Sequence, residues 1–135
     1  MLRMRITTMM LVLALAAVAC SDEVGGREAR LQRASQGLCD AQVHAFEANV
    51  RRAAAVFDAE SHAFLHELAA DLEDIDRAAA ANLLEAKQRV ERALVDPTRS
   101  DPQEVNLLIA GLQRALGEGA EAAGLPAPLC RNGAS

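Results

Sequence analysis

Apolar residues recur at helical spacing through most of the chain after residue 40. Intervals of three and four residues place them on one face of a helix. The series runs through Val43, Phe46, Val50, Ala53, Phe57, Phe64, Leu68, Leu72, Ile75, Ala79, Leu83, Ala86, Val90 and Leu94. Neither glycine nor proline occurs between Gly37 and Pro97, and the interval is rich in strong helix formers. Since no stretch alternates like a strand, the pattern predicts an all-α protein.

Polar clusters and capping residues predict where these helices begin and end. A first helix is expected from residues 39–40 to about Phe57, followed by a turn at the sequence DAES, residues 58–61. A second helix follows from Ser61 to Val95, either unbroken or bent within residues 71–77. The sequence DPTRSDP predicts a loop, and Asp101 with Pro102 predicts the start of a last helix. We therefore expect a small bundle of three antiparallel helices with a long second helix, or of four if that helix is broken.

The first twenty residues have the order of a secretory signal peptide. Arg3 and Arg5 precede an unbroken apolar run at residues 9–19, and small residues follow at its end. The run is shorter than the roughly 18–20 residues that a membrane span needs. It ends in a polar segment that no span would tolerate. We therefore expect cleavage near residue 19.

The residues at this end, AVAC, resemble the lipobox of bacterial lipoproteins, in which a small residue precedes a lipidated cysteine. The resemblance implies that Cys20 carries lipid, palmitate included, and becomes the mature N-terminus. It also implies an extracytoplasmic protein anchored to a bacterial membrane. The alternative is ordinary secretion, because Ala17-Val18-Ala19 also fits the small-x-small cleavage pattern.

Three cysteines, Cys20, Cys39 and Cys130, constrain the organisation of the chain. Lipidation of Cys20 leaves an even pair, and the expected helix lengths return the C-terminus close to Cys39 in either topology. We therefore expect a Cys39–Cys130 disulfide. The expected organisation is a signal peptide over residues 1–19, the lipidated cysteine with a polar tether over 20–36, and a helical domain over 37–135.

Composition and charge exclude several classes of function. The net charge is −5, and it falls to −7 without the signal peptide, so counterion release cannot drive nucleic-acid binding. The chain has no Trp or Tyr and only three Phe, which argues against an interface anchored by large aromatic residues. It also lacks C-x-x-C-H, and all four Met lie within the first ten residues, which argues against haem.

His62 and His66 are the most suggestive candidates for chemistry. They are four residues apart, so both imidazoles lie on one helix face, as in many zinc sites. Helix geometry places Glu73 and His44 too far away to complete a site, so a single chain should bind zinc weakly. The other interpretation is a pair of solvated surface histidines. Nearby, Glu60, Glu67, Asp71 and Asp74 form an acidic stripe, expected either to be solvated or to bind a basic partner.

No pattern of catalytic residues emerges from the sequence. There is no nucleophile elbow and no Gly-rich phosphate loop. The sequence therefore predicts a non-enzymatic, lipid-anchored structural or protein-interaction module of the cell envelope. Its protein partner is unknown, and no cofactor is expected apart from zinc. The alternative is a metal-binding lipoprotein that uses His62 and His66.

Overall fold

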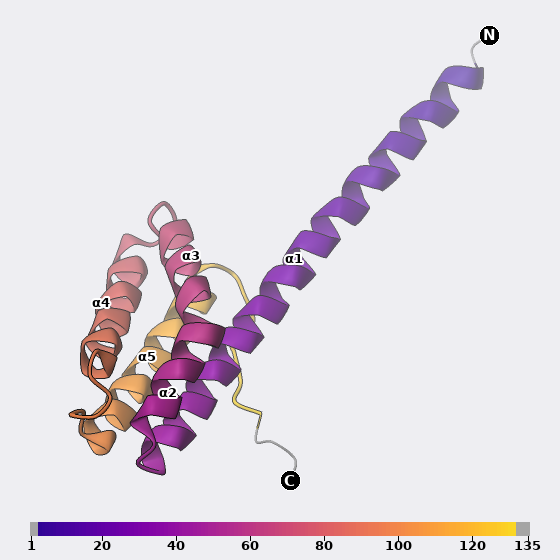
Figure 1. Ribbon diagram of the computed structural model, residues 1–135. Coiled ribbons are helices and arrows are strands. Elements are labelled where there is room, and N and C mark those ends of the chain that lie inside the picture. The colour runs from indigo at the N-terminus through magenta and orange to yellow at the C-terminus, as the bar shows by residue number, and fades with distance from the viewer. Residues whose placement is uncertain (1–2, 132–135) are drawn as a thin grey trace.

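The computed structural model describes the backbone of residues 3–131 and the side chains of residues 25–131. Its elements are α1 (Arg3–Phe46), α2 (Val50–Val56), the π-helical η1 (Phe57–His62), α3 (Ala63–Leu72), α4 (Arg77–Leu94) and α5 (Pro102–Ala122). The segments α2, η1 and α3 follow one another without a break and form one helical arm, so four arms make up the bundle (Figure 1). No strand occurs in residues 3–131, and the all-α fold class is confirmed.

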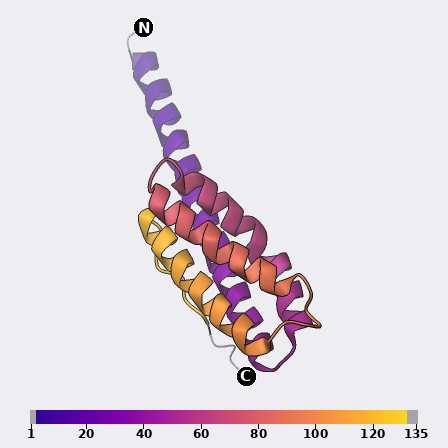
Figure 2. The same cartoon turned by 90° about the vertical axis from the view of Figure 1, so that its left-hand side faces the viewer.

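Helix α1 is longer than the sequence analysis predicted. Its first half projects beyond the bundle, and its second half packs against the other arms (Figures 1 and 2). Leu31, Ala34 and Leu38 are buried in the core. The expectation of a tether through residue 36 is therefore wrong, because Ala, Leu, Arg and Gln outweigh the two glycines at 25 and 26 and continue the helix.

The first turn of the bundle lies at residues 47–49 rather than at 58–61. Ala48 has a positive φ of 59°, which ends the helical path of α1. The Asn49 side chain then accepts a hydrogen bond from the Arg52 backbone N–H at 3.1 Å and caps α2. The first helix therefore ends eleven residues earlier than predicted, at Phe46 instead of Phe57.

Residues 58–61, which were predicted to form a turn, belong to η1. A π-helix bonds each residue to the fifth one along, which widens the helix locally without ending it. Ser61 is fully buried, and its hydroxyl donates to the Ala34 carbonyl of α1 at 2.8 Å. The hydroxyl thus finds its partner on the neighbouring helix, and the polar residues that favoured a turn do not produce one.

The predicted long second helix is broken, so the four-helix alternative is correct. Helix α3 ends at Leu72, and the Asp76 carboxylate accepts a hydrogen bond from the Ala79 N–H at 3.0 Å to cap α4. Helix α4 then runs back along α3 (Figure 2). The start of the last helix is confirmed, because Asp101 caps α5 through the Gln103 N–H and Pro102 occupies its first turn.

The core is built mainly from Leu and Ala, with Phe57 and Phe64 as its only aromatic residues among residues 25–131. The expected Cys39–Cys130 disulfide is present, with a Cα–Cα distance of 5.8 Å. The C-terminal tail that carries Cys130 runs along α1 (Figure 1). Gln32 bonds the Leu129 backbone there, and Gln36 accepts from the Arg131 N–H at 2.9 Å.

No helix among the described residues has both the length and the apolar character needed to cross a membrane. The Cys20 side chain lies outside the described side chains, so its predicted lipidation stays a prediction.

Candidate functional site

The antiparallel pairing of the α2–η1–α3 arm with α4 brings four polar side chains together. His62 lies at the end of η1 and His66 one turn later in α3, while Lys87 and Glu91 lie one turn apart on α4. In a helical hairpin, residues at similar distances from the turn face each other. With the turn ending at Asp76, His66 faces Lys87 and His62 faces Glu91.

The four side chains form one connected network. Nε2 of His62 lies 2.9 Å from Oε1 of Glu91, and the same oxygen accepts from the Lys87 ammonium. Nζ of Lys87 also lies 2.9 Å from Nε2 of His66. The two imidazole rings meet edge to face, with their centroids 4.9 Å apart. Three donor atoms, one from each histidine and one from Glu91, therefore converge on the same small volume.

Lys87 is the unusual member of this network, since its side chain is only 2% exposed. A buried ammonium requires partners of opposite charge or with lone pairs. It finds them in the Glu91 carboxylate and in Nε2 of His66, which must be unprotonated in order to accept from an ammonium group. The positive charge of Lys87 is thus held between two groups that could also bind a metal ion.

The electrostatics of Glu91 reflect the same arrangement. Burial alone would raise the pKa of Glu91, but the hydrogen bond and charge of Lys87, followed by those of His62, outweigh it. The net result is a pKa below the usual value for this carboxyl. Glu91 is therefore a carboxylate at neutral pH, which is the form that accepts hydrogen bonds or coordinates a cation.

This geometry corrects one expectation from the sequence. His62 and His66 do lie together on one face, but the prediction that no third ligand lies within reach is wrong. Glu91 supplies it from α4, and the donor atoms of His62, His66 and Glu91 all lie within 4.8 Å of one another. The other two candidates do not join them. Glu73 pairs with Arg77, and His44 on α1 pairs with Glu47 in the turn that follows α1.

Comparison with protein-family models, with curated proteins and with solved structures gives no match for this chain. The site therefore has to be interpreted from its own residues.

The acidic stripe lies against arginines of α1. Arg27 pairs with Asp71, and Arg30 forms a two-point hydrogen bond with Glu67. The guanidinium of Arg30 also lies 5.6 Å from the centre of the Phe64 ring. The hydrogen bond from Arg30 lowers the pKa of Glu67 below its usual value, against a smaller opposing effect of burial. Two of the four stripe carboxylates therefore join α1 to α3, which leaves less negative charge for a basic partner.

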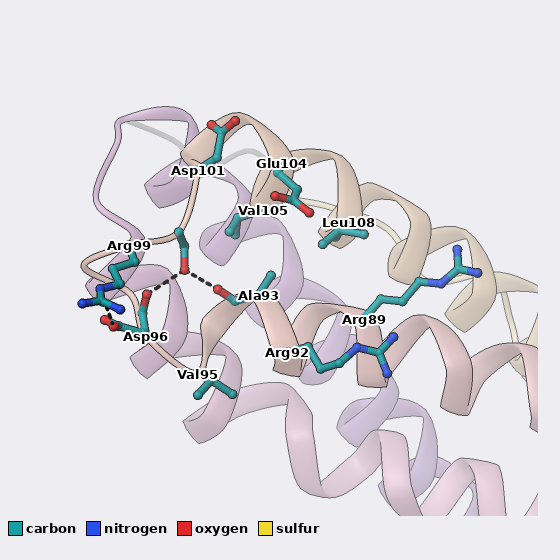
Figure 3. Close-up of a pocket in the computed structure, with 11 residues that line it drawn as sticks. Arg89, Arg92, Ala93, Val95, Asp96, Arg99, Asp101, Glu104, Val105 and Leu108 are labelled. Atoms are coloured by element: carbon teal, nitrogen blue, oxygen red, sulfur yellow. Dashed lines mark hydrogen bonds and ion pairs between the residues drawn. The ribbon is translucent and has the colours of Figure 1, made fainter.

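An open groove of about 670 Å³ lies where α4 leads through its loop into α5 (Figure 3). Arg89 and Arg92 extend along it from α4, while Glu104 and Leu108 face them from α5. At the loop end, Arg99 pairs with Asp96 at 3.6 Å, and the Ser100 hydroxyl donates to the Ala93 and Asp96 carbonyls. Because charges of both signs line the groove, it favours neither an anionic nor a cationic ligand.

A second hollow, of about 530 Å³, lies where α1 ends beside the start of α5. Phe46 and Leu107 line it together with Pro102 and Asn106. Phe46 is 83% exposed and Leu107 67% exposed, so two large apolar side chains face solvent at this end of the bundle.

Proposed function

We propose that this protein is a lipid-anchored helical module of the bacterial cell envelope, with a structural or protein-interaction role rather than an enzymatic one. The observation that carries the proposal is the continuity of α1. One helix connects the segment around Cys20 to the bundle and ends at Phe46, at the far end of the bundle (Figure 1).

The length of α1 determines how far the proposed lipid anchor lies from the opposite end of the bundle. From Cys20 to Phe46 the helix rises by about 39 Å at 1.5 Å per residue. A lipid on Cys20 would therefore lie at one end of the molecule, and the exposed Phe46 and Leu107 at the other. The apolar end of the bundle would face away from the membrane that holds the protein.

This far end has the character of a protein contact surface. A single exposed apolar side chain is ordinary on a protein surface. Several large apolar side chains exposed next to one another more often mark a site of protein interaction. We propose that an apolar side chain of an envelope protein inserts between Phe46 and Leu107. The disulfide supports an extracytoplasmic location, since such bonds persist in oxidising compartments.

The test combines fractionation with cross-linking in the native host. The unmodified protein should fractionate with membranes, and Cys20→Ser should move it to the soluble fraction, because stable anchoring takes more than one acyl chain. Phe46→Ser should abolish a specific cross-linked species and leave the protein at the membrane. Val95→Ser, a change at a similarly exposed apolar residue, is the matched control and should keep that species. A soluble unmodified protein, or a cross-link that survives Phe46→Ser, would contradict the proposal.

A further inference from the structure

We propose that His62, His66 and Glu91 form a binding site for a divalent transition-metal cation such as Zn²⁺, and that the Lys87 ammonium occupies the cation position in the metal-free protein. This site is separate from the surface of Phe46 and Leu107 and does not depend on the membrane anchor. It lies on the side of the α3–α4 hairpin, between two helices that the core holds in place.

The donor set fits the proposed metal. Two imidazole nitrogens and one carboxylate oxygen are the three protein ligands of several zinc sites that keep a fourth position open. The three donor atoms lie within 4.8 Å of one another. A zinc tetrahedron with bonds of about 2.1 Å has edges of ~3.4 Å, so the donors need only a modest inward movement. His66 is exposed and His62 partly exposed, so their side chains have room for that movement.

Lys87 is the observation that points to a cation rather than to a simple hydrogen-bond network. Its ammonium is buried and lies between Nε2 of His66 and Oε1 of Glu91. Both atoms direct lone pairs at it, which is the arrangement that a metal ion requires of its ligands. The protein thus already holds a positive charge at the point where the metal would bind.

Metal binding and Lys87 should therefore compete. A cation can enter only if the ammonium leaves Glu91 and His66, and its long flexible stem permits a swing toward solvent. Lys87 keeps its proton as it moves and loses only its hydrogen bonds to Glu91 and His66. An imidazole nitrogen binds a metal in its unprotonated form, so the Nε2 proton that His62 directs at Glu91 moves to Nδ1 or to water. The expected consequence is that the unmodified protein binds zinc more weakly than its three ligands alone would allow.

The experiment is a calorimetric zinc titration of the full chain with its disulfide intact. It is carried out in a Cys20→Ser background, because a free thiol would bind zinc elsewhere. Binding should be 1:1, and His66→Ala and Glu91→Gln should each weaken it by at least about tenfold, as loss of a site residue commonly does. His44→Ala is the matched control, because His44 lies on α1 beside Glu47, and it should leave the affinity unchanged.

The variant Lys87→Met distinguishes a metal-binding site from a hydrogen-bond network that only stabilises the fold. Methionine keeps the apolar stem and removes the positive charge that competes with the metal, so zinc affinity should rise by at least about tenfold. Circular dichroism checks the fold of each variant. Since His66 is exposed, His66→Ala should retain the native helicity. If Lys87→Met does not fold, the loss of zinc affinity in His66→Ala still tests the proposed site. No stoichiometric zinc binding, or binding that is insensitive to His66→Ala and Glu91→Gln, would overturn the proposal.

Discussion

At the scale of single residues, the stability of the contact between α3 and α4 depends on the charges and hydrogen bonds around Glu91. This carboxylate receives hydrogen bonds from His62 and from the buried Lys87. If it is removed, Lys87 keeps only the lone pair of His66 as a partner. An ammonium group without its counter-charge in the interior is among the costlier changes that a small domain can suffer.

Glu91→Gln should therefore destabilise the protein by about 2 kcal/mol at neutral pH, less than a fully buried pair because Glu91 is 32% exposed. The lowered pKa of Glu91 sets the pH dependence. Its stabilisation is fully present above the usual pKa of about 4.5 and is lost as the pH falls through the lower folded value. Denaturant unfolding between pH 7 and pH 3 measures this dependence. The difference in free energy of unfolding between the unmodified protein and the Glu91→Gln protein should shrink as the pH falls.

Glu85→Gln is the control for this measurement, since it removes an exposed pair with Arg89 one turn earlier on α4. It should cost no more than about 0.5 kcal/mol. A Glu91→Gln protein as stable as the Glu85→Gln protein at neutral pH would contradict the role assigned to Glu91.

The sequence identified His62 and His66 but not their partners, and the reason lies in the register of the hairpin. The pairing of His66 with Lys87 depends on where the turn falls, and the sequence left the helix through residues 71–77 either bent or continuous. Once Asp76 is known to cap α4, Lys87 and Glu91 follow as the facing residues. Capping by Asp76 was the available signal, because Asp is a favoured N-cap residue.

At the scale of elements, the contact between α1 and η1 depends on the absence of a side chain at Gly37. A Cβ at this position would lie 2.5 Å from the Glu60 Cβ and 2.6 Å from the Ser61 Oγ. The same close approach allows the Ser61 hydroxyl to reach the Ala34 carbonyl. Gly37 is therefore needed for helix packing and not for a turn.

Gly37→Ala should destabilise the protein by about 1–2 kcal/mol, because overpacking exceeds the gain in helix propensity. The thermal midpoint should fall by roughly 4–8 °C per kcal/mol for a domain of this size. Gly111→Ala in α5 is the matched control, since nothing lies within 4 Å of the added Cβ. It should raise stability by up to about 1 kcal/mol. Equal midpoints for the two variants in a thermal melt would refute this account of the contact.

Helix boundaries could be predicted from the sequence where capping residues and apolar periodicity agree. They could not be predicted where a local backbone conformation overrides both signals. Asp101 and Pro102 marked the start of α5 correctly. The turn at Ala48 was not predicted, because alanine is the strongest helix former and gives no sign of a positive φ. The polar sequence of η1 was misinterpreted as a turn because a π-helix keeps Ser61 buried and bonded across to α1.

At the scale of the whole molecule, the Cys39–Cys130 disulfide joins the C-terminal tail to α1 across a separation of 91 residues. The tail has few other attachments, mainly the hydrogen bonds to Gln32 and Gln36. The disulfide therefore restricts the unfolded chain more than it supports the helices. This pairing was predictable from cysteine number and helix lengths, whereas the path of the tail along α1 was not.

Cys130→Ser should lower stability by up to about 4–5 kcal/mol on the loop-entropy estimate, and leave helicity unchanged at room temperature. The helices persist because the buried core residues all lie between Leu31 and Ala120, before the tail begins. Thermal melts followed by circular dichroism measure both quantities. Reduction of the unmodified protein should reproduce the effect, and an unchanged midpoint in both cases would rule out a stabilising role for the disulfide.

The molecule as a whole is arranged along one axis, with Cys20 on the projecting half of α1 and Phe46 at the opposite end of the bundle. That arrangement has its proposed meaning only if Cys20 carries lipid. The lipobox-like sequence AVAC is the basis for that expectation, and a cleaved, acylated N-terminus is its direct chemical consequence.

The intact mass of the protein purified from the membrane fraction of its native host tests this most directly. We predict a chain that begins at Cys20, with additional mass equal to more than one acyl chain and with the Cys39–Cys130 disulfide formed. A mass that corresponds to the bare polypeptide, recovered from the soluble fraction, would contradict it.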